Sequence, residues 1–573
     1  MRWQIPAVDP EIVGNLSREL GLSPLVARML VLRGLEEPQA AQRFLCPSLD
    51  HLHDPFLMAD MKPAVERLER AIVQQEKILI YGDYDVDGTM AVVVLLTALR
   101  TLGARVEAYI PHRMTDGYGM RIPVIEEAHA QGYHVILSVD TGVREHEVLA
   151  RARELGIDCI VTDHHLPDSS LPSACAILNP QRTDCSYPEK SLAGVGVAFK
   201  LAQALLGPRM NARRVESYLK VVCLGTIADV VPLVGENRVI ASFGLAALRE
   251  PSNAGLAALL AVSELGGRAI TPYDVGFRLA PRINAAGRME NARDVIELFT
   301  TSDRARAEEI ARKLDSLNRE RQQVEDQIRT TIVEEMDRNP EKARQYSLVF
   351  AGEGWHRGVI GIVAQRVVDR YYRPTLVMGV EDGVAVGSGR SIKGFHLLDA
   401  LTRSASLFDR FGGHAQAAGF ALPADRVGEL EKQFESHARS VLSPQDLEPV
   451  LGIDTEVDFA DLTWDFHEQL QKLGPHGSGN PAPVFATRDV TILSPPRVLK
   501  EKHLKLRVGQ GTAALDALAW RMAARAPQLA AGQPVDLAFT LESNSYQDVT
   551  SLQLVVKDIR PRSSESGFGS KEK

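Results

Sequence analysis

Two clusters of metal-ligating side chains follow short apolar segments in the first half of the chain. The acidic run Asp83-Tyr84-Asp85-Val86-Asp87-Gly88 follows Ile78–Tyr81 after one glycine, and Asp163-His164-His165 comes directly after Cys159–Thr162. Carboxylates suit Mg²⁺ or Mn²⁺, and an added imidazole moves the preference towards Mn²⁺ or another transition metal. The two clusters together offer more anionic ligands than a fold needs for its stability.

The sequence between Lys77 and about Asp229 alternates strand-like and helix-like segments. We expect five strands, at residues 78–81, 106–110, 135–139, 159–162 and 176–178. Strands that alternate with helices predict a parallel sheet covered on both faces, and ligands of such sheets gather beyond the carboxyl ends of the strands. The acidic run, Asp140 and the Asp-His-His segment all follow strands, so we expect them to converge on one crevice. A helix is expected from about Met90 to Leu102.

The acidic run has three competing interpretations. The start of a calcium-binding EF-hand loop requires a carboxylate at position twelve, which is Val94 here, and a helix before the loop instead of a strand. The aspartyl-phosphate phosphatase signature is satisfied by Asp85–Thr89 and would make Asp85 a covalent nucleophile, but that chemistry has no use for Asp-His-His. A solvated turn would hold three like charges that repel one another unless a cation neutralises them. We therefore favour a site for two metal ions, of the kind that many enzymes use to hydrolyse phosphodiester bonds.

Composition narrows the class of protein. The chain of 573 residues is 45% hydrophobic and 24% charged, which indicates a globular protein of two to four domains. A net charge of -9 argues against coating nucleic acid by bulk charge but allows a local basic groove. We expect no membrane span and no signal peptide at the N-terminus. The five cysteines include no CxxC pair, and the apolar surroundings of Cys159 and Cys223 predict that these two are buried thiols, which indicates a reducing, cytoplasmic location.

The rest of the chain divides into further segments. Apolar residues recur at helical spacing from about Thr301 to Glu335, which predicts a long amphipathic helix that connects two lobes. A second α/β unit follows, with two glycine-rich stretches at residues 387–391 and 411–419. From about Leu451 short alternating strands predict a small β-barrel, and the Ser-, Gly- and charge-rich residues 563–573 predict disorder.

Several polar residues outside the two clusters are candidates for ligand contacts. Asp229 lies among apolar neighbours, where it is either a helix cap or a metal ligand. Arg282 and Arg288 flank a run of small residues that includes Asn284, which is typical of a phosphate contact or of surface arginines on a helix turn. Arginine together with an aromatic suits a phosphate and a stacked base, and the loop after the second strand holds both, at Arg113 and Tyr118.

These motifs, in this order, resemble the DHH phosphoesterase family. The resemblance spans nearly the whole chain and rests on residues 81–89, 138–142, 162–165, 227–232, 281–289, 354–364, 411–419 and 474–481. One departure is His476, where the family usually has an aromatic residue. The resemblance implies an α/β fold with a DHH parallel-sheet domain, a DHH-associated α/β domain joined to it by a long helix, and a C-terminal OB-fold β-barrel. The implied boundaries are an N-terminal helical segment 1–70, the DHH domain 71–300, the connecting helix 301–340, the DHH-associated domain 341–445, the OB-fold domain 446–562 and the tail 563–573.

The resemblance also implies roles for individual residues. Two ions, Mn²⁺ or Mg²⁺, would be held by Asp83, Asp85, Asp87, Asp140, His164 and Asp229, with Asp140 bridging. His165 would face the scissile phosphate and act in catalysis with Asp85 and Asp140. The substrate would be bound by Arg113, Tyr118, Arg282, Asn284, Arg288, Arg357, Arg390, Ser391 and His414.

The activity implied is that of the family's single-strand-specific exonucleases. Such an enzyme would degrade single-stranded DNA from 5′ to 3′, release mononucleotides, and serve DNA repair, recombination and mismatch repair. Expected partners are single-stranded DNA, a single-strand-binding protein and a RecQ-type helicase, with the chain itself a monomer. Two alternatives are a phosphodiesterase for short oligonucleotides or cyclic dinucleotides and a non-enzymatic single-strand-binding protein. The β-barrel disfavours the first, and carboxylates in the groove disfavour the second.

Overall fold

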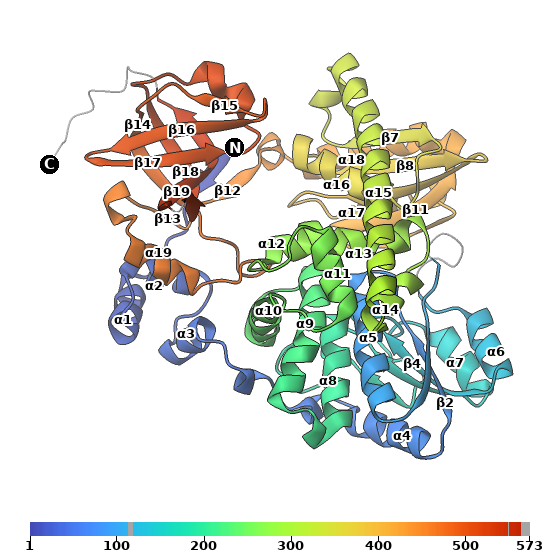
Figure 1. Ribbon diagram of the computed structural model, residues 1–573. Coiled ribbons are helices and arrows are strands. Elements are labelled where there is room, and N and C mark those ends of the chain that lie inside the picture. Colours follow the sequence, from blue (N-terminus) through green and yellow to red (C-terminus); the bar gives the residue numbers. More distant parts are fainter. Residues whose placement is uncertain (113–118, 548, 563–573) are drawn as a thin grey trace. The chain divides into compact units, whose positions relative to one another are not determined.

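The structure is a computed structural model that describes residues 1–112, 119–547 and 549–562 (Figure 1). It separates into two units. The larger unit consists of Leu49–Val231 and Val239–Pro449, and the smaller unit of Met1–Ser48, Pro232–Arg238 and Val450–Lys573. The expected tail, residues 563–573, lies outside the described part of the chain.

A five-stranded parallel sheet forms the first half of the larger unit. The strand order is β3-β2-β4-β5-β6, and the bounds are β2 Lys77–Tyr81, β3 Arg105–Tyr109, β4 Tyr133–Val139, β5 Asp158–Thr162 and β6 Ala176–Leu178. Alternate residues of one strand enter different cores: Ile78 and Ile80 pack on one face, and Leu79 and Tyr81 on the other. This explains why the strands are continuous apolar runs, and it confirms the predicted parallel sheet with two covered faces.

The helix expected after β2 is present, but it begins earlier than predicted. Helix α5 runs from Val86 to Thr101 and does not start near Met90. The side chain of Asp85 accepts a hydrogen bond from the Gly88 N–H and caps the helix, so the acidic run is half loop and half first turn. The other helices of this half are α4 Met61–Val73, α6 Ile122–Ala130, α7 His146–Glu154, α8 Gly194–Leu206, α9 Ala212–Ala228, α10 Gly235–Ala247, α11 Ala254–Val262, α12 Pro272–Asp274, α13 Ala280–Met289 and α14 Arg293–Thr300.

The predicted long helix is α15, which spans Arg304–Arg338. Its first half contributes Ile310 and Leu314 to the core of the first sheet, and its second half contributes Ile328 and Ile332 to the core of a second sheet. One rigid element is therefore built into both halves of the larger unit, as the connecting-helix prediction required (Figure 1).

The second sheet has five strands in the order β10-β11-β9-β8-β7, with only β7 and β8 parallel. Its bounds are β7 Leu348–Glu353, β8 Thr375–Glu381, β9 Val384–Arg390, β10 Arg410–Gly413 and β11 Ala417–Pro423, and its helices are α16 Ile360–Tyr371, α17 Leu397–Arg403 and α18 Val427–Val441. The two glycine-rich stretches lie within β9, β10 and β11. Close packing explains one glycine, because a Cβ on Gly387 would lie 2.2 Å from the ring of Phe420.

The smaller unit is built around a β-barrel. Strand β14 (Phe485–Ile492) pairs with both β18 (Pro534–Tyr546) and β16 (His503–Gln510), and β17 (Ala513–Ala519) and β19 (Val549–Pro561) complete the ring. Short strands β13 (Thr455–Glu456) and β15 (Arg497–Leu499) extend the sheet, while β1 (Arg2–Gln4) pairs with β12 (Val450–Gly452). The helices of this unit are α1 Pro10–Leu20, α2 Pro24–Leu32, α3 Pro38–Leu45 and α19 Trp464–Gln471.

One buried arginine connects the separate chain segments of this unit. Arg238 donates hydrogen bonds to the carbonyl oxygens of Phe44, Lys472, Leu473 and Gly474, and its guanidinium lies 3.7 Å from the centroid of the Phe44 ring. Burial lowers the pKa of Arg238 to about 10. The N-terminal helices and the barrel also share one apolar core, to which Met29 and Phe539 both belong.

Two further expectations concern the whole chain. Within the described residues, no helix combines the length and the apolar character needed to cross a bilayer. Each of the five cysteines is a free thiol, and Cys159 and Cys223 are buried, as predicted.

Candidate metal centre

The acidic run after β2 is held by the first turns of two helices. Asp87 lies in the first turn of α5 and is almost fully buried. Its Oδ2 accepts a hydrogen bond from the Gly194 N–H at 2.6 Å, and its Oδ1 accepts one from the Val195 N–H at 2.9 Å. These donors are the first N–H groups of α8, where the helix dipole favours a negative charge. The carboxylate of Asp87 is thereby fixed in position at the edge of the sheet.

Asp140 ends β4 in a strained backbone conformation. Its φ is 58°, in the left-handed region that costs a non-glycine residue roughly 1–3 kcal/mol. The Asp140 N–H donates to the Thr162 carbonyl at 2.9 Å, which ties the end of β4 to the end of β5. The Asp140 carboxylate packs closely against Gly194, and a larger residue would not fit there, because a Cβ on Gly194 would lie 2.7 Å from Asp140 Oδ1. Strain and close packing of this kind are typical of functional sites.

Asp163 organises the two histidines after β5. Its Oδ1 accepts the backbone N–H groups of His164 and His165 at 2.7 and 3.1 Å, and lies 2.7 Å from His165 Nδ1. Its Oδ2 accepts the Val143 N–H at 3.0 Å. The first residue of the motif therefore orients the histidines and lies outside the groups that surround His164 Nε2.

Asp229 reaches the same edge from the end of α9. It occupies the C-cap position of that helix, and the next residue, Val230, has a φ of 62°. A β-branched residue in the left-handed region is a genuine outlier, which marks this turn as constrained. The two interpretations of Asp229 are therefore compatible, because it terminates a helix and also joins the cluster.

These side chains converge around His164 Nε2. That nitrogen lies 3.1 Å from Asp140 Oδ1, 3.7 Å from Asp87 Oδ2 and 3.7 Å from Asp229 Oδ2. Three groups of potential ligands have their donor atoms within 4.8 Å of one another: Asp87, His164 and Asp229; Asp83, Asp85 and Asp140; and Asp140, His164 and His165. All six predicted metal ligands belong to these groups, together with His165, and the fold brings them together.

The electrostatics of the cluster are unfavourable without a cation. Burial, and then the charge of Asp85, raises the pKa of Asp87 to about 7, and burial raises that of Asp229 to about 9. The pKa of Asp140 is also well above its usual value, because of burial and the neighbouring carboxylates. Burial lowers the pKa of His164 to about 4, so its ring is neutral and does not balance these charges. The donor set therefore fits one or more divalent cations.

His165 has the opposite character. Burial alone would lower its pKa, but the hydrogen bond and the charge of Asp163 raise it above the usual value. Its side chain is 37% exposed and lines a cavity of about 310 Å³ with Arg144, Glu145 and His414. An imidazole whose cationic form is favoured, beside the carboxylate cluster, suits contact with a phosphate oxygen.

Some of the predicted substrate-binding residues line cavities, and others are paired with acidic residues of the protein. His414 shares the cavity of His165, and Asn284 and Arg288 line a groove of about 430 Å³. Arg282 is held by an ion pair with Asp315 of α15 at 2.9 Å, and Arg357 by Glu381 at 3.1 Å. The structure therefore gives these two arginines partners within the protein.

The remaining predicted contacts lie on or beside β9 or outside the described residues. Arg390 donates to Ser388 Oγ and to the Gly389 carbonyl, and Ser391 Oγ donates to the Phe395 carbonyl. Arg113 and Tyr118 lie outside the residues that the structure describes.

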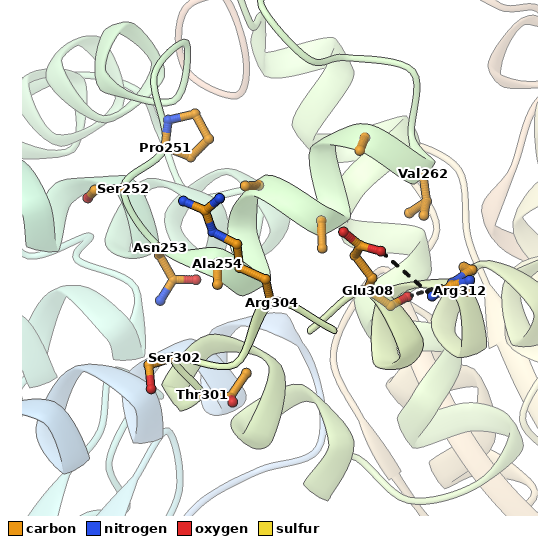
Figure 2. Close-up of a pocket in the computed structure, with 13 residues that line it drawn as sticks. Pro251, Ser252, Asn253, Ala254, Val262, Thr301, Ser302, Arg304, Glu308 and Arg312 are labelled. Carbon is orange, nitrogen blue, oxygen red and sulfur yellow. Dashed lines mark hydrogen bonds and ion pairs between the residues drawn. The ribbon is translucent and has the colours of Figure 1, made fainter. Parts of the chain in front are cut away.

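A larger cavity of about 980 Å³ lies between α11 and the start of α15. Figure 2 shows its lining, in which Arg312 contacts Glu308 and the floor includes the alanines of α11. Glu308 is the one carboxylate among these lining residues, and none of them is a histidine. Volume alone therefore does not locate the chemistry, and the carboxylate–histidine edge of the first sheet is the better candidate.

Sequence models of known families match three parts of this chain. Residues 77–226 match the DHH family N-terminal domain, residues 344–440 the DHHA1 domain, and residues 453–558 the RecJ OB domain. The single-stranded-DNA-specific exonuclease RecJ of Escherichia coli is 33% identical over 98% of this chain and 100% of its own length. The chain belongs to the RecJ family.

Other RecJ proteins support this assignment. The RecJ of Bacillus subtilis is 37% identical over 97% of this chain and 70% of its own length. Among solved structures, RecJ from Thermus thermophilus in complex with Mn²⁺ superimposes with a TM-score of 0.84 at 29% identity, covering 98% of this chain and 80% of that protein. The same RecJ has also been solved with Mg²⁺.

Proposed function

We propose that this chain is a divalent-metal-dependent exonuclease that hydrolyses single-stranded DNA. Its RecJ relatives carry that activity in their names, and one of them binds Mn²⁺ and Mg²⁺. The observation that carries the proposal is the convergence of carboxylates and His164 at the carboxyl edge of the first sheet. An OB domain in the same chain suits binding of single-stranded nucleic acid.

We assign two metal positions to this edge. Asp87, His164 and Asp229 would hold one Mn²⁺ or Mg²⁺, Asp83 and Asp85 the other, and Asp140 would contact both. When bound, such ions polarise the phosphoryl oxygen and increase the acidity of the attacking water. Fixed donors support the assignment, because the Gly194 and Val195 N–H groups orient Asp87 before any ligand arrives.

His165 is proposed as the catalytic residue that contacts the reacting phosphate. With Nδ1 engaged by Asp163, its Nε2–H would donate to a non-bridging phosphate oxygen. The Asp163 carboxylate favours the cationic form of the ring and fixes its orientation, and in that form the positive charge would oppose the charge that develops on the phosphate.

We further propose 5′→3′ polarity with release of mononucleotides. The cavity beside His165 has the size of a small-ligand site and is lined by polar groups from both halves of the larger unit, which would suit the terminal nucleotide. Arg113, Tyr118, Arg288, Arg390, Ser391 and His414 are the proposed contacts to the strand. Roles in repair and recombination, a cytoplasmic location, a monomeric state, and partnership with a single-strand-binding protein and a RecQ-type helicase belong to the same proposal.

The test is a nuclease assay with end-labelled DNA. The protein is incubated with 5′-labelled and 3′-labelled single strands and with matched duplex, in EDTA, Mg²⁺ or Mn²⁺. Early release of the 5′ label as mononucleotide, from single strands and with metal, supports the proposal. Cleavage confined to very short oligomers would replace it with an oligonucleotide phosphodiesterase, and tight binding without cleavage would replace it with a binding protein.

A further inference from the structure

Two aromatic rings of the larger unit stack on each other in solvent. Tyr273 is 65% exposed and Phe277 is 60% exposed. Their ring centroids lie 4.7 Å apart, and the ring planes differ by 25°. Single exposed apolar side chains are common on protein surfaces, whereas adjacent ones that form a patch are typical of a site that contacts a ligand or partner.

The short helix beneath these rings is rigidly built. Thr271 and Asp274 form a capping box at the start of α12, and Asp274 also pairs with Arg278 at 3.6 Å. Arg278 donates to the Ser263 carbonyl oxygen. Val275 and Leu279 anchor the following π-helical turn, Val275–Leu279, in the core. The rings are therefore presented by an ordered element, and π-helical turns are frequent at functional sites.

A groove leads from these rings towards the metal centre. Its lining includes Phe277, Asn284 and Arg288 of α13, and Ala228, the neighbour of Asp229. Helix α13 lies directly against the acidic run, because a Cβ on Gly287 would be 2.7 Å from the Tyr84 carbonyl oxygen. Ten residues of helix separate Phe277 from Gly287, which corresponds to about 15 Å.

The groove carries more positive than negative side chains. Its charged lining consists of Arg288, Arg321, Arg366, Glu325 and Asp326. Glu325 accepts hydrogen bonds from Arg321 at 2.5 Å and from Arg366 at 3.1 Å, so one carboxylate is shared by two guanidinium groups. The side chain of Arg366 is 46% exposed and keeps donors for a further anion. This small excess of positive charge, on a chain of net charge -9, suits a phosphate backbone.

We propose that Tyr273 and Phe277 form a stacking platform for one base of the single strand, a few nucleotides from the metal centre. This inference rests on the proposed function and adds a determinant of strand specificity to it. Every base has a π face, so such a platform accepts any sequence. In a duplex the bases are already paired and stacked, so a duplex cannot use the platform without being opened.

An abasic scan measures this contact directly. Binding of a 12-nucleotide oligo(dT) is measured with the full chain carrying Asp140→Asn, so that the DNA stays intact. A single abasic site is moved along the strand. At one position, roughly four nucleotides from the cleaved end at 3.4 Å per stacked base, removal of the base should weaken binding about tenfold.

The protein side of the experiment is the double variant Tyr273→Ala/Phe277→Ala. It should bind the intact strand about tenfold more weakly, and the abasic penalty at that one position should vanish. The variant Tyr273→Phe/Phe277→Tyr should restore both, while Tyr273→Leu/Phe277→Leu, which keeps apolar surface without π faces, should not. Phe56→Ala, which removes a ring that is 53% exposed elsewhere, is the matched control.

Two results would overturn the inference. An abasic penalty that persists in the double alanine variant would place the base contact elsewhere, and unchanged affinity would show that the rings serve another contact. The scan measures binding alone, so its failure is distinguishable from failure of the proposed function, which is tested by whether the wild-type chain with Mn²⁺ or Mg²⁺ cleaves long single strands.

Discussion

The two sheets of the larger unit differ in whether their polar side chains have partners within the protein. At the edge of the first sheet, Asp87, Asp140 and Asp229 crowd around a neutral His164, and all three carboxyl pKa values are raised. In the second sheet, Arg390 and Ser391 are hydrogen-bonded within the protein, and Gly387 admits the ring of Phe420. The first edge is electrostatically unfavourable without a cation, whereas the polar groups of the second sheet are already paired and are held in place for the proposed contacts to the strand. Variants of the two regions should therefore fail differently.

The largest effect is expected from Asp140→Asn. Removing the carboxylate shared by both proposed metal positions should lower kcat at least about 10³-fold, because the ions supply several kcal/mol of transition-state stabilisation. The metal-free variant should be at least as stable as wild type, since one repelling buried charge is gone. Nuclease assays and thermal unfolding measure the two quantities. Near-normal turnover would exclude Asp140 from the metal centre.

A smaller effect is expected from Asp163→Asn, which should lower kcat roughly 10- to 100-fold by releasing the orientation of His165. The carboxylate of Asp163 raises the pKa of His165, so its loss lowers that pKa. If the cationic ring is the active form, activity falls as pH rises through the pKa, and the fall should move to lower pH in the variant. A pH–rate profile decides this, and an unshifted profile would contradict the role of His165.

In the second sheet, Gly387→Ala should reduce stability without touching the metals. The added Cβ would meet the Phe420 ring at 2.2 Å, and overpacking of this kind costs about 1–3 kcal/mol. Gly412→Ala, in the same sheet, is the matched control, because its Cβ would meet nothing within 4 Å. Denaturant unfolding and Mn²⁺ affinity are measured together. Loss of metal binding in a folded Gly387→Ala protein would contradict the view that the second sheet does not affect the metal centre.

The smallest effect is expected on the thermal stability that bound metal adds, which should depend on pH. Without metal, the raised pKa values of about 7 for Asp87 and 9 for Asp229 mean that stability is lost as pH rises from about 4 towards 9. Metal binds the ionised carboxylates, so Mg²⁺ should raise Tm by a few degrees more at pH 8.5 than at pH 6. Asp229→Asn should flatten this dependence. An equal rise in Tm at both pH values would argue against metal ligation by these carboxyls.

Local sequence patterns were sufficient for the strands that lead into the metal centre, but not for α8 and α9, which hold Asp87 and Asp229. Continuous apolar runs ending in polar residues identified β2, β4 and β5, and parallel pairing then required Asp85, Asp140 and His164 to share an edge. Helical spacing identified α15. Apolar runs and helical spacing are both local patterns, and the rule that ligands bind at the carboxyl ends of parallel strands then locates the site.

Features that depend on distant contacts were not predictable. The glycine-rich stretches form β9, β10 and β11 because neighbours pack closely on them, although glycine weakens strands in isolation. The pairing of Arg282 with Asp315 and the common core of the N-terminal helices with the barrel join segments far apart in the chain. Truncation at Leu451 would therefore divide that core, so point variants are the better probes of the barrel.

The most direct test of the metal centre counts the Mn²⁺ ions bound per chain by equilibrium titration of wild type, Asp140→Asn and His164→Ala. Our assignment predicts two ions on the wild-type chain and a loss of binding in both variants while their folds persist. Binding that survives undiminished in the two variants would contradict the assignment, because the ions would then lie away from the edge where these side chains converge.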